Sequence, residues 1–228
     1  MSSANAAGHA AQPRLHHHFE SYEQQRESAT LGMWFFIAQE ILFFGGIFMA
    51  YIVYRMANPV AFAAASHELD ITLGGFNTVV LIASSLTMAM GVRAAQLGDR
   101  KKLVTFLLLT ILLGMTFLGV KVVEYTAKYE HHLIPGVHWD WKGTSFHDVP
   151  YNPNGARQFY GLYFGMTGLH ALHMIIGIGI LGWMVVMARR DHWSSDNYNF
   201  VEGVGLYWHF VDIVWIFLFP LLYLIGRH

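Results

Sequence analysis

The fold of this chain is decided by Leu31-Gly-Met-Trp-Phe-Phe-Ile-Ala-Gln-Glu40-Ile-Leu-Phe-Phe-Gly-Gly-Ile-Phe-Met-Ala50, an apolar run with a carboxylate at its centre. About ten residues lie on each side of Glu40, so at a helical rise of roughly 1.5 Å per residue the acid lies near the middle of a bilayer. A charge at that depth costs at least about 2.5 kcal/mol, so the side chain must be paired, protonated or functional. Glu40 is therefore the first candidate functional residue.

The composition is typical of a membrane protein. Hydrophobic residues make up 54% of the chain and aromatic residues 15%, whereas only 13% of the residues are charged. Because the chain has no cysteine, it forms no disulfide framework, no thiolate metal site and no cysteine nucleophile. A net charge of -1, with no stripe of basic residues, argues against a nucleic-acid partner.

The hydrophobic pattern predicts an all-α integral membrane protein with two parts. Residues 1–29 are polar and predict a flexible N-terminal tail, in which His16-His17-His18 could bind a metal loosely or simply be part of a disordered segment. Residues 30–228 predict a single transmembrane domain. Its five apolar segments of spanning length lie near 30–54, 71–97, 103–127, 158–188 and 199–226.

The basic residues predict how the chain is oriented in the membrane. The short segment Gly98-Asp-Arg-Lys-Lys102 and the pair Arg189-Arg190 lie between spans on the same side as the N-terminus. The positive-inside rule then places the N-terminus inside and the C-terminus outside. Residues 128–157 become the main outer loop, and their three prolines, two tryptophans and four histidines suit a segment that lies on the interface or on a partner.

Polar side chains that hydrocarbon would not tolerate alone recur in four of the five spans. Several stand three residues apart, so they share a helix face and can act together. Together with Glu40, the candidate site residues are Lys121 and Glu124, His170 and His173, and His209 and Asp212.

Three interpretations of this set compete. Imidazoles and carboxylates on facing helices could bind a metal or haem, although neither widely stacked histidines nor repeated Glu-x-x-His motifs are present. The same groups could form a proton or ion pathway. The simplest interpretation is that they make hydrogen bonds between helices or bind lipid head groups.

The residues resemble subunit III of the haem–copper oxidases, the family of respiratory cytochrome c and quinol oxidases. The strongest match is the Glu-bearing helix, Gly32-Met-Trp-Phe-Phe-Ile-Ala-Gln-Glu40-Ile-Leu-Phe-Phe-Gly-Gly. Four further motifs follow in family order: Phe76-Asn-Thr-Val-Val-Leu-Ile-Ala-Ser-Ser85, Leu112-Leu-Gly-Met-Thr-Phe with Glu124-Tyr125, Gly168-Leu-His-Ala-Leu-His173-Met-Ile-Ile-Gly177, and Tyr207-Trp-His-Phe-Val-Asp-Ile-Val-Trp215.

This resemblance implies a non-catalytic subunit of an aerobic terminal oxidase in the bacterial inner membrane. The subunit would pack beside subunits I and II, which hold the haem and copper, and would bind none itself. It would support assembly, stability and proton uptake of the core that reduces oxygen and pumps protons. It would also bind phospholipid in a cleft. Glu40 would be the family's intramembrane glutamate, with His170, His173 and His209 as its expected hydrogen-bonding neighbours.

One departure from the family pattern bears on these expectations. Many members have two helices before the Glu-bearing one, whereas this sequence resembles the five-span bacterial form, which includes quinol oxidases. Since the missing pair forms one wall of the lipid cleft, a lipid site here requires another subunit to replace that wall. The long loop 128–157 suggests a docking surface for a further subunit or a donor complex. An independent small transporter that uses Glu40, and a membrane haem or di-iron enzyme, are the alternatives.

Overall fold

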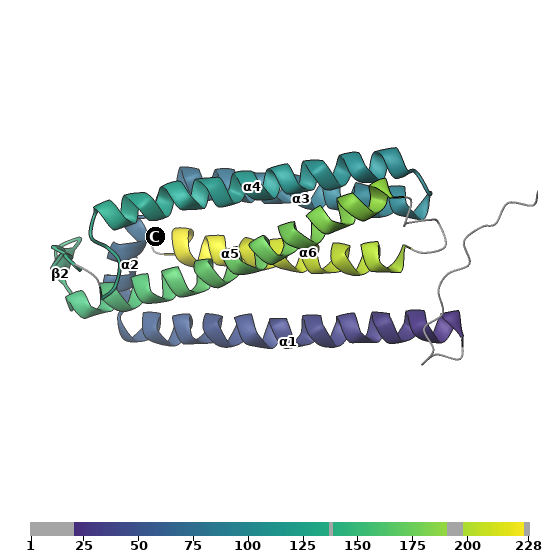
Figure 1. Cartoon of the computed structure of the whole chain (residues 1–228). Helices are drawn as coiled ribbons and strands as arrows, with labels where there is room; N and C mark the ends of the chain where they lie inside the picture. Colours follow the sequence, from purple (N-terminus) through teal and green to yellow (C-terminus); the bar gives the residue numbers. More distant parts are fainter. Residues whose placement is uncertain (1–20, 137–138, 191–197, 226–228) are drawn as a thin grey trace, which may run out of the picture.

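The computed structural model describes residues 21–136, 139–190 and 198–225. Long helices run side by side, with α3 and α4 along one side of the molecule, α1 along the other, and α5 and α6 between them (Figure 1). The elements in chain order are α1 (Tyr22–Ala57), α2 (Pro59–His67), α3 (Ile71–Gln96), α4 (Arg100–Glu130), a small antiparallel hairpin of β1 (Ser145–Phe146) and β2 (Val149–Pro150), α5 (Pro153–Arg189), α6 (Asn199–Phe219) and a π-helical turn (Pro220–Leu224).

Five of these helices are long and apolar enough to cross a membrane, which confirms the predicted all-α membrane fold. The spanning segments are Glu23–Ala57, Ile71–Gln96, Arg100–Glu130, Pro153–Arg189 and Asn199–Leu224. Glu40 is the middle residue of the first segment, as the apolar run around it predicts.

The first helix begins earlier than the composition indicated. Residues 22–29, which were expected to belong to the polar tail, form the first turns of α1. The reason is a local cap: the Ser21 hydroxyl accepts a hydrogen bond from the Gln24 backbone N–H at 3.1 Å, and Glu23 favours the positive end of the helix. The rest of the predicted tail, with His16-His17-His18, lies outside the described residues.

The loop predicted at 128–157 is shorter in the structure, because both flanking helices extend into it. The helix α4 continues to Glu130, and α5 begins at Pro153. Proline suits the first turn of a helix because its missing N–H has no partner there. The side chain of Asn152 accepts from the backbone N–H of Asn154 at 3.0 Å and caps the new helix. The connecting segment is therefore 131–152.

A tryptophan of α6 lies where four helices meet. Trp208 is fully buried, and its indole Nε1 donates to Ser84 Oγ of α3 at 2.9 Å. A Cβ placed on Gly114 of α4 would be 3.0 Å from the ring, and one on Gly177 of α5 would be 2.9 Å from it. The two glycines therefore make room for the indole, as small residues do at close helix crossings in membranes.

The end of α6 is held by side chains of the first two helices. The chain changes to a π-helical turn at Pro220–Leu224, and the last carbonyl groups of a helix have no partner within it, so those of this turn need other donors. Tyr51 Oη donates to the Leu221 carbonyl at 2.9 Å, and Ser66 Oγ donates to that of Leu222 at 2.8 Å. Arg55 Nη2 likewise donates to the Ile225 carbonyl at 2.8 Å. These bonds fasten α1 and α2 to the end of α6.

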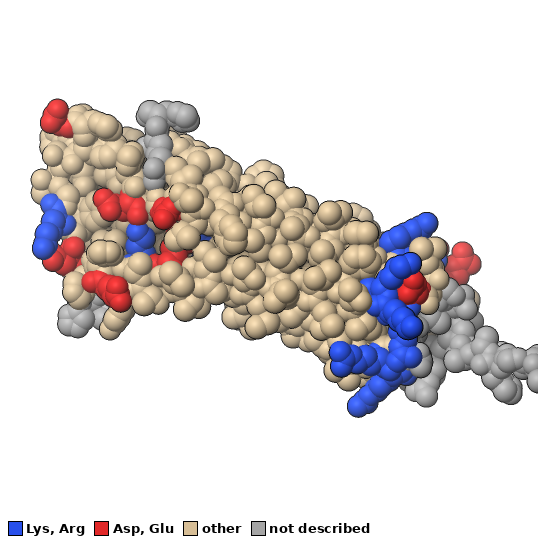
Figure 2. Space-filling view, turned by 90° about the horizontal axis from the view of Figure 1, so that it is seen from above, with Lys and Arg blue, Asp and Glu red and all other residues tan. Residues whose placement is uncertain are grey.

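On the face shown in Figure 2, the visible charged side chains lie towards the two ends of the molecule, with an uncharged band between them. The Lys and Arg side chains gather most densely at the end where α1 starts, which we call the basic end. The opposite end, which carries α2 and the segment 131–152, is called the loop end. Asp99 at the basic end caps α4, and hydrogen bonds from Lys102 hold the pKa of its carboxyl below the usual range. The exposed basic residues of this end include Arg93, Arg100, Lys101, Lys102, Arg189 and Arg190.

The contact between Trp208 and Gly177 gives a test of the packing. We expect Gly177→Ala to destabilise the chain by about 1–3 kcal/mol relative to Gly179→Ala, because overpacking a filled core costs that much. The control has the same change in helix propensity, but its Cβ would meet nothing within 4 Å. The measurement is the fraction of the chain that stays soluble in mild detergent after graded heating. Equal curves for the two variants would contradict the packing role.

Candidate functional site

The acid at the centre of α1 lies beside a histidine of α5. His173 Nε2 is 3.2 Å from Glu40 Oε2, and the two side chains are only 14% and 10% exposed. The other ring nitrogen, Nδ1, lies 2.8 Å from the Leu169 carbonyl oxygen. Because a carbonyl only accepts, Nδ1 carries a hydrogen, and Nε2 faces the carboxylate. The contact is at ion-pair distance, although Glu40 Oε2 has no hydrogen bond within the described residues.

An apolar groove runs from this pair towards the basic end. We call it the Glu40 groove; it has a volume of about 750 Å³ and lies between α1, α5 and α6. Tyr207 on its wall donates from Oη to the His173 carbonyl at 2.9 Å. The groove therefore offers a long apolar surface that ends at a polar pair. Besides Glu40, His173 and Tyr207, its lining consists of Met33, Phe36, Ile176, Gly179, Ile180, Trp183, Phe200 and Val204.

The predicted pair Lys121 and Glu124 forms, and it is part of a three-membered network. Lys121 Nζ lies 2.7 Å from Glu124 Oε2 and 2.8 Å from Tyr223 Oη. Tyr223 Oη donates in turn to Glu124 Oε1 at 2.5 Å. The ammonium also lies 4.5 Å from the centre of the Trp215 ring, a distance suited to a cation–π interaction. All of these side chains are buried, so the charges are neutralised inside the bundle rather than by lipid head groups.

His170 does not lie beside Glu40, in contrast to the expectation from the sequence. Its imidazole is fully buried, with ring centres 5.3 Å from both Phe117 and Trp215. Residues three apart on an α-helix point about 60° away from each other, which directs His173 towards α1 and His170 towards α4 and α6. Within the described residues, neither nitrogen of His170 has a hydrogen-bond partner.

His209 is also on a different face from Glu40, although it does share a site with Asp212 as the sequence predicted. Its Nδ1 lies 2.7 Å from Ser85 Oγ of α3. His209, Asp212 and Ser85 line a second apolar groove, of about 380 Å³, between α3 and α6. We call this the Asp212 groove. The expected cluster of one acid and three histidines is therefore divided among three places in the bundle.

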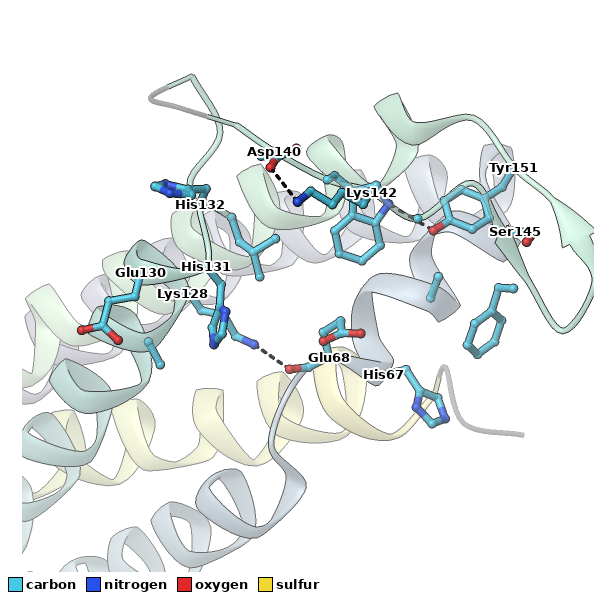
Figure 3. Close-up of a pocket in the computed structure, with 16 residues that line it drawn as sticks. His67, Glu68, Lys128, Glu130, His131, His132, Asp140, Lys142, Ser145 and Tyr151 are labelled. Carbon is cyan, nitrogen blue, oxygen red and sulfur yellow. Dashed lines mark hydrogen bonds and ion pairs between the residues drawn. The ribbon is translucent and has the colours of Figure 1, made fainter.

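A third pocket, of about 760 Å³, opens at the loop end (Figure 3). Lys128 Nζ donates to the Glu68 carbonyl oxygen at 2.5 Å, and Lys142 forms an ion pair with Asp140 at 3.4 Å. His131 points into the space beside Lys128 and Glu68 (Figure 3). Side chains of both signs line the pocket, so it suits a polar or zwitterionic surface better than a ligand of one charge. Much of its lining comes from the segment 131–152.

Possible metal ligands do not gather in one place in the described part of the chain. No group of three or more His, Cys, Asp or Glu side chains within it could hold a metal ion. Glu40 and His173 approach each other as a pair, and His209 meets a serine.

Sequence reasoning missed three of the residues that complete these sites. Tyr223 lies 102 positions from Lys121, so no local spacing connects them. Trp215 and Ser85 both lie in the motifs that carry the family resemblance. Membership in those motifs could have identified them as candidates.

The match to known proteins covers nearly the whole chain. The family described as "Cytochrome c oxidase subunit III" matches residues 16–149 and 146–227. The chain belongs to the cytochrome c oxidase subunit III family. With five apolar helices long enough to span a membrane and bacterial relatives, it is a multi-pass protein of a bacterial membrane. Membership in this family implies association with other oxidase subunits.

Individual relatives support the same family. A cytochrome c oxidase subunit 3 of Synechocystis sp. is 31% identical over 195 residues, which cover 85% of this chain and 74% of the relative. One from Alkalihalophilus pseudofirmus is 28% identical over 210 residues, 92% of each chain. A quinol oxidase subunit 3 of Bacillus spizizenii is 29% identical over 208 residues, 90% of this chain and 92% of the relative.

The buried network gives a second test. We expect Lys121→Met to destabilise the chain by about 3–5 kcal/mol, because it leaves Glu124 buried without its cation. Adding Glu124→Gln should recover part of that loss, since the remaining group is then uncharged. The measurement is again solubility after heating in detergent. Lys101→Met removes an exposed lysine and serves as the control, with an expected effect within about 0.5 kcal/mol. If Lys121→Met matched this control, the network would not stabilise the bundle.

Proposed function

We propose that the chain is the non-catalytic third subunit of an aerobic terminal oxidase of the cytochrome c oxidase type. In this role it supports the assembly, stability and proton uptake of a core that reduces oxygen to water and pumps protons. The observation that carries the proposal is the family match along all five spanning helices. Related proteins bear the names of both cytochrome c and quinol oxidases, so a quinol oxidase is the alternative assembly.

The partners in this proposal are oxidase subunits I and II, which contain the haem and copper. The apolar face of α1 supports an assembly within the membrane, because large side chains on it are exposed. Examples are Phe35 and Leu42, whose exposed fractions are 76% and 78%. Apolar faces of this kind suit lipid tails or a partner's helices.

We also propose that the Glu40 groove holds an acyl chain of a phospholipid. Its lining is almost entirely apolar, and the single acid in it already has His173 as a partner. A hydrocarbon chain can therefore fill the space and leave the contact between Glu40 and His173 in place. The walls of this groove come from α1, α5 and α6, so the proposed site does not use the two helices that the five-span form lacks.

The loop end is proposed as a docking surface for a further subunit or an electron-donor complex. The segment 131–152 presents both charged groups and tryptophans there, and Trp139 and Trp141 stack with their ring centres 6.3 Å apart. A surface with both signs of charge and rigid aromatic rings is suited to protein recognition.

Purification through an affinity tag on this chain tests the proposed function. After extraction in mild detergent, we expect a haem–copper core to accompany the chain, visible in the absorption spectrum, with oxygen-reducing activity. Subunit identification would then establish the donor. A colourless and stable solitary protein would contradict the proposal and favour the independent transporter that uses Glu40.

A substitution at Glu40 tests the role of that acid. Because the chain lies outside the redox core in this proposal, we expect Glu40→Gln to leave the initial oxygen consumption near normal and to shorten the turnover lifetime. Glutamine keeps the shape and a hydrogen-bonding group but does not titrate. Leu42→Ala, at an exposed position of the same helix, is the control. Loss of turnover in an intact complex would instead make Glu40 an obligatory proton carrier.

A further inference from the structure

Two acids lie at the middle of their membrane spans, and they differ in whether the chain provides a partner. Glu40 is central in Glu23–Ala57, and Asp212 is within one residue of the centre of Asn199–Leu224. The first faces His173 at 3.2 Å. The second is only 2% exposed, yet neither of its carboxylate oxygens has a hydrogen-bond partner within the described residues.

We propose that the Asp212 groove is the docking site for a transmembrane helix of a partner oxidase subunit, which donates a hydrogen bond to Asp212. The inference rests on the proposed function, and it assigns a specific face of the chain to the assembly. The donor is a side chain such as Arg, Lys, Tyr, Trp or Ser, placed at mid-membrane on the partner's helix.

The groups around Asp212 do not replace such a donor. Ser85 is near enough to interact with the carboxyl group, but its hydroxyl makes its hydrogen bond with His209 Nδ1, at 2.7 Å. A carboxylate has about four lone-pair positions, so even a reoriented hydroxyl would leave most of them unpaired. Protonation does not remove the need either, since the neutral acid has an O–H group that requires an acceptor.

The depth of Asp212 excludes the head group of a lipid as the missing partner. The hydrocarbon core is about 30 Å thick, so head groups lie roughly 15 Å from its middle. Acyl chains reach the groove but have no hydrogen-bond donor. A buried polar group without a partner is strongly unfavourable in such surroundings. An occupant that brings a donor to mid-membrane depth would remove this cost, and a helix with a polar side chain does so.

The walls of the groove fit a helix as well. Ser85 and Ala89 of α3 are small and stand four residues apart, so another backbone can approach closely there. Ile213 and Ile216 of α6, with Leu86 of α3, form exposed apolar ridges on either side. A helix in this position would cover these ridges and bring its polar side chain over Asp212.

The two grooves thus differ in the kind of occupant they accept. In the Glu40 groove the acid is paired within the chain, and an apolar lipid tail completes the site. In the Asp212 groove the chain lacks a donor, and only an occupant with one completes the site. The contrast is independent of the size of the grooves, since it depends on His173, which lies at ion-pair distance from Glu40.

Site-specific cross-linking in the intact complex tests this assignment. A photo-cross-linkable p-benzoyl-phenylalanine replaces Ile213 in the Asp212 groove or Ile176 in the Glu40 groove; the two side chains are 50% and 48% exposed. We expect Ile213 to give a cross-link to another oxidase subunit and Ile176 to give none to protein. A product at Ile213 that contains only lipid or a second copy of this chain would overturn the inference.

Substitution of the acid provides a second readout. We expect Asp212→Leu to reduce the haem-bearing core retained by the tagged chain about tenfold, since a hydrogen bond to a charged group is lost at the interface. Asp212→Asn keeps a hydrogen-bonding group and should stay within about twofold of the parent. The level of each variant in the membrane, measured with the tag, shows that the chain still folds. Equal retention by the Leu and Asn variants at normal membrane levels would contradict a role in docking.

These results distinguish the inference from the function on which it rests. If the unsubstituted chain retains no haem-bearing core, the proposed function fails. If the core is retained but Ile213 gives no cross-link to it, only the docking site is wrong.

Discussion

Hydrocarbon offers no hydrogen bonds, and this constraint governs how the five spanning helices are arranged. Each helix satisfies its own backbone, so the side chains that need partners decide which helices meet. Lys121 and Glu124 require the hydroxyl of Tyr223, which brings α4 against the turn that follows α6. Glu40 requires His173, which brings the middle of α1 to α5. Apolar packing then fills the space that these polar contacts define.

The packing shows why α1 is both attached and partly separate. At the loop end, Tyr51 and Arg55 hold it to the carbonyl groups after α6. Towards the basic end the Glu40 groove lies between it and the rest of the bundle. By contrast, Trp208 fits directly against Gly114 and Gly177, which leaves no space between α4, α5 and α6 at that level. The helices α4, α5 and α6 are therefore closely packed around Trp208, whereas α1 is separated from α5 and α6 by the Glu40 groove.

How much the sequence predicted depended on how local each interaction is. The spans, the family and the pair of Lys121 and Glu124 follow from hydropathy, motif order and a spacing of three residues. The partner of Glu40 could not be chosen among three histidines at similar depth, because the rotation of each helix decides which one faces α1. Tyr223 could not be found at all, since it is distant in sequence and tyrosine is common at membrane interfaces. The end of the tail was misplaced because Ser21 caps the helix before the apolar run begins.

The contacts of residues 220–225 determine when the bundle can close during synthesis. Ribosomes deliver the chain from its N-terminus, so Tyr51, Ser66, Lys121 and Glu124 enter the membrane before residues 220–225 exist. Lys121 and Glu124 can neutralise each other at once, because they belong to the same helix. The hydroxyls of Tyr51 and Ser66 can donate to the carbonyls of Leu221 and Leu222 only after those residues have been added to the chain. The bundle is thus completed only after residues 220–225 have been made, and a nascent chain that stops at residue 219 lacks the contacts that close it.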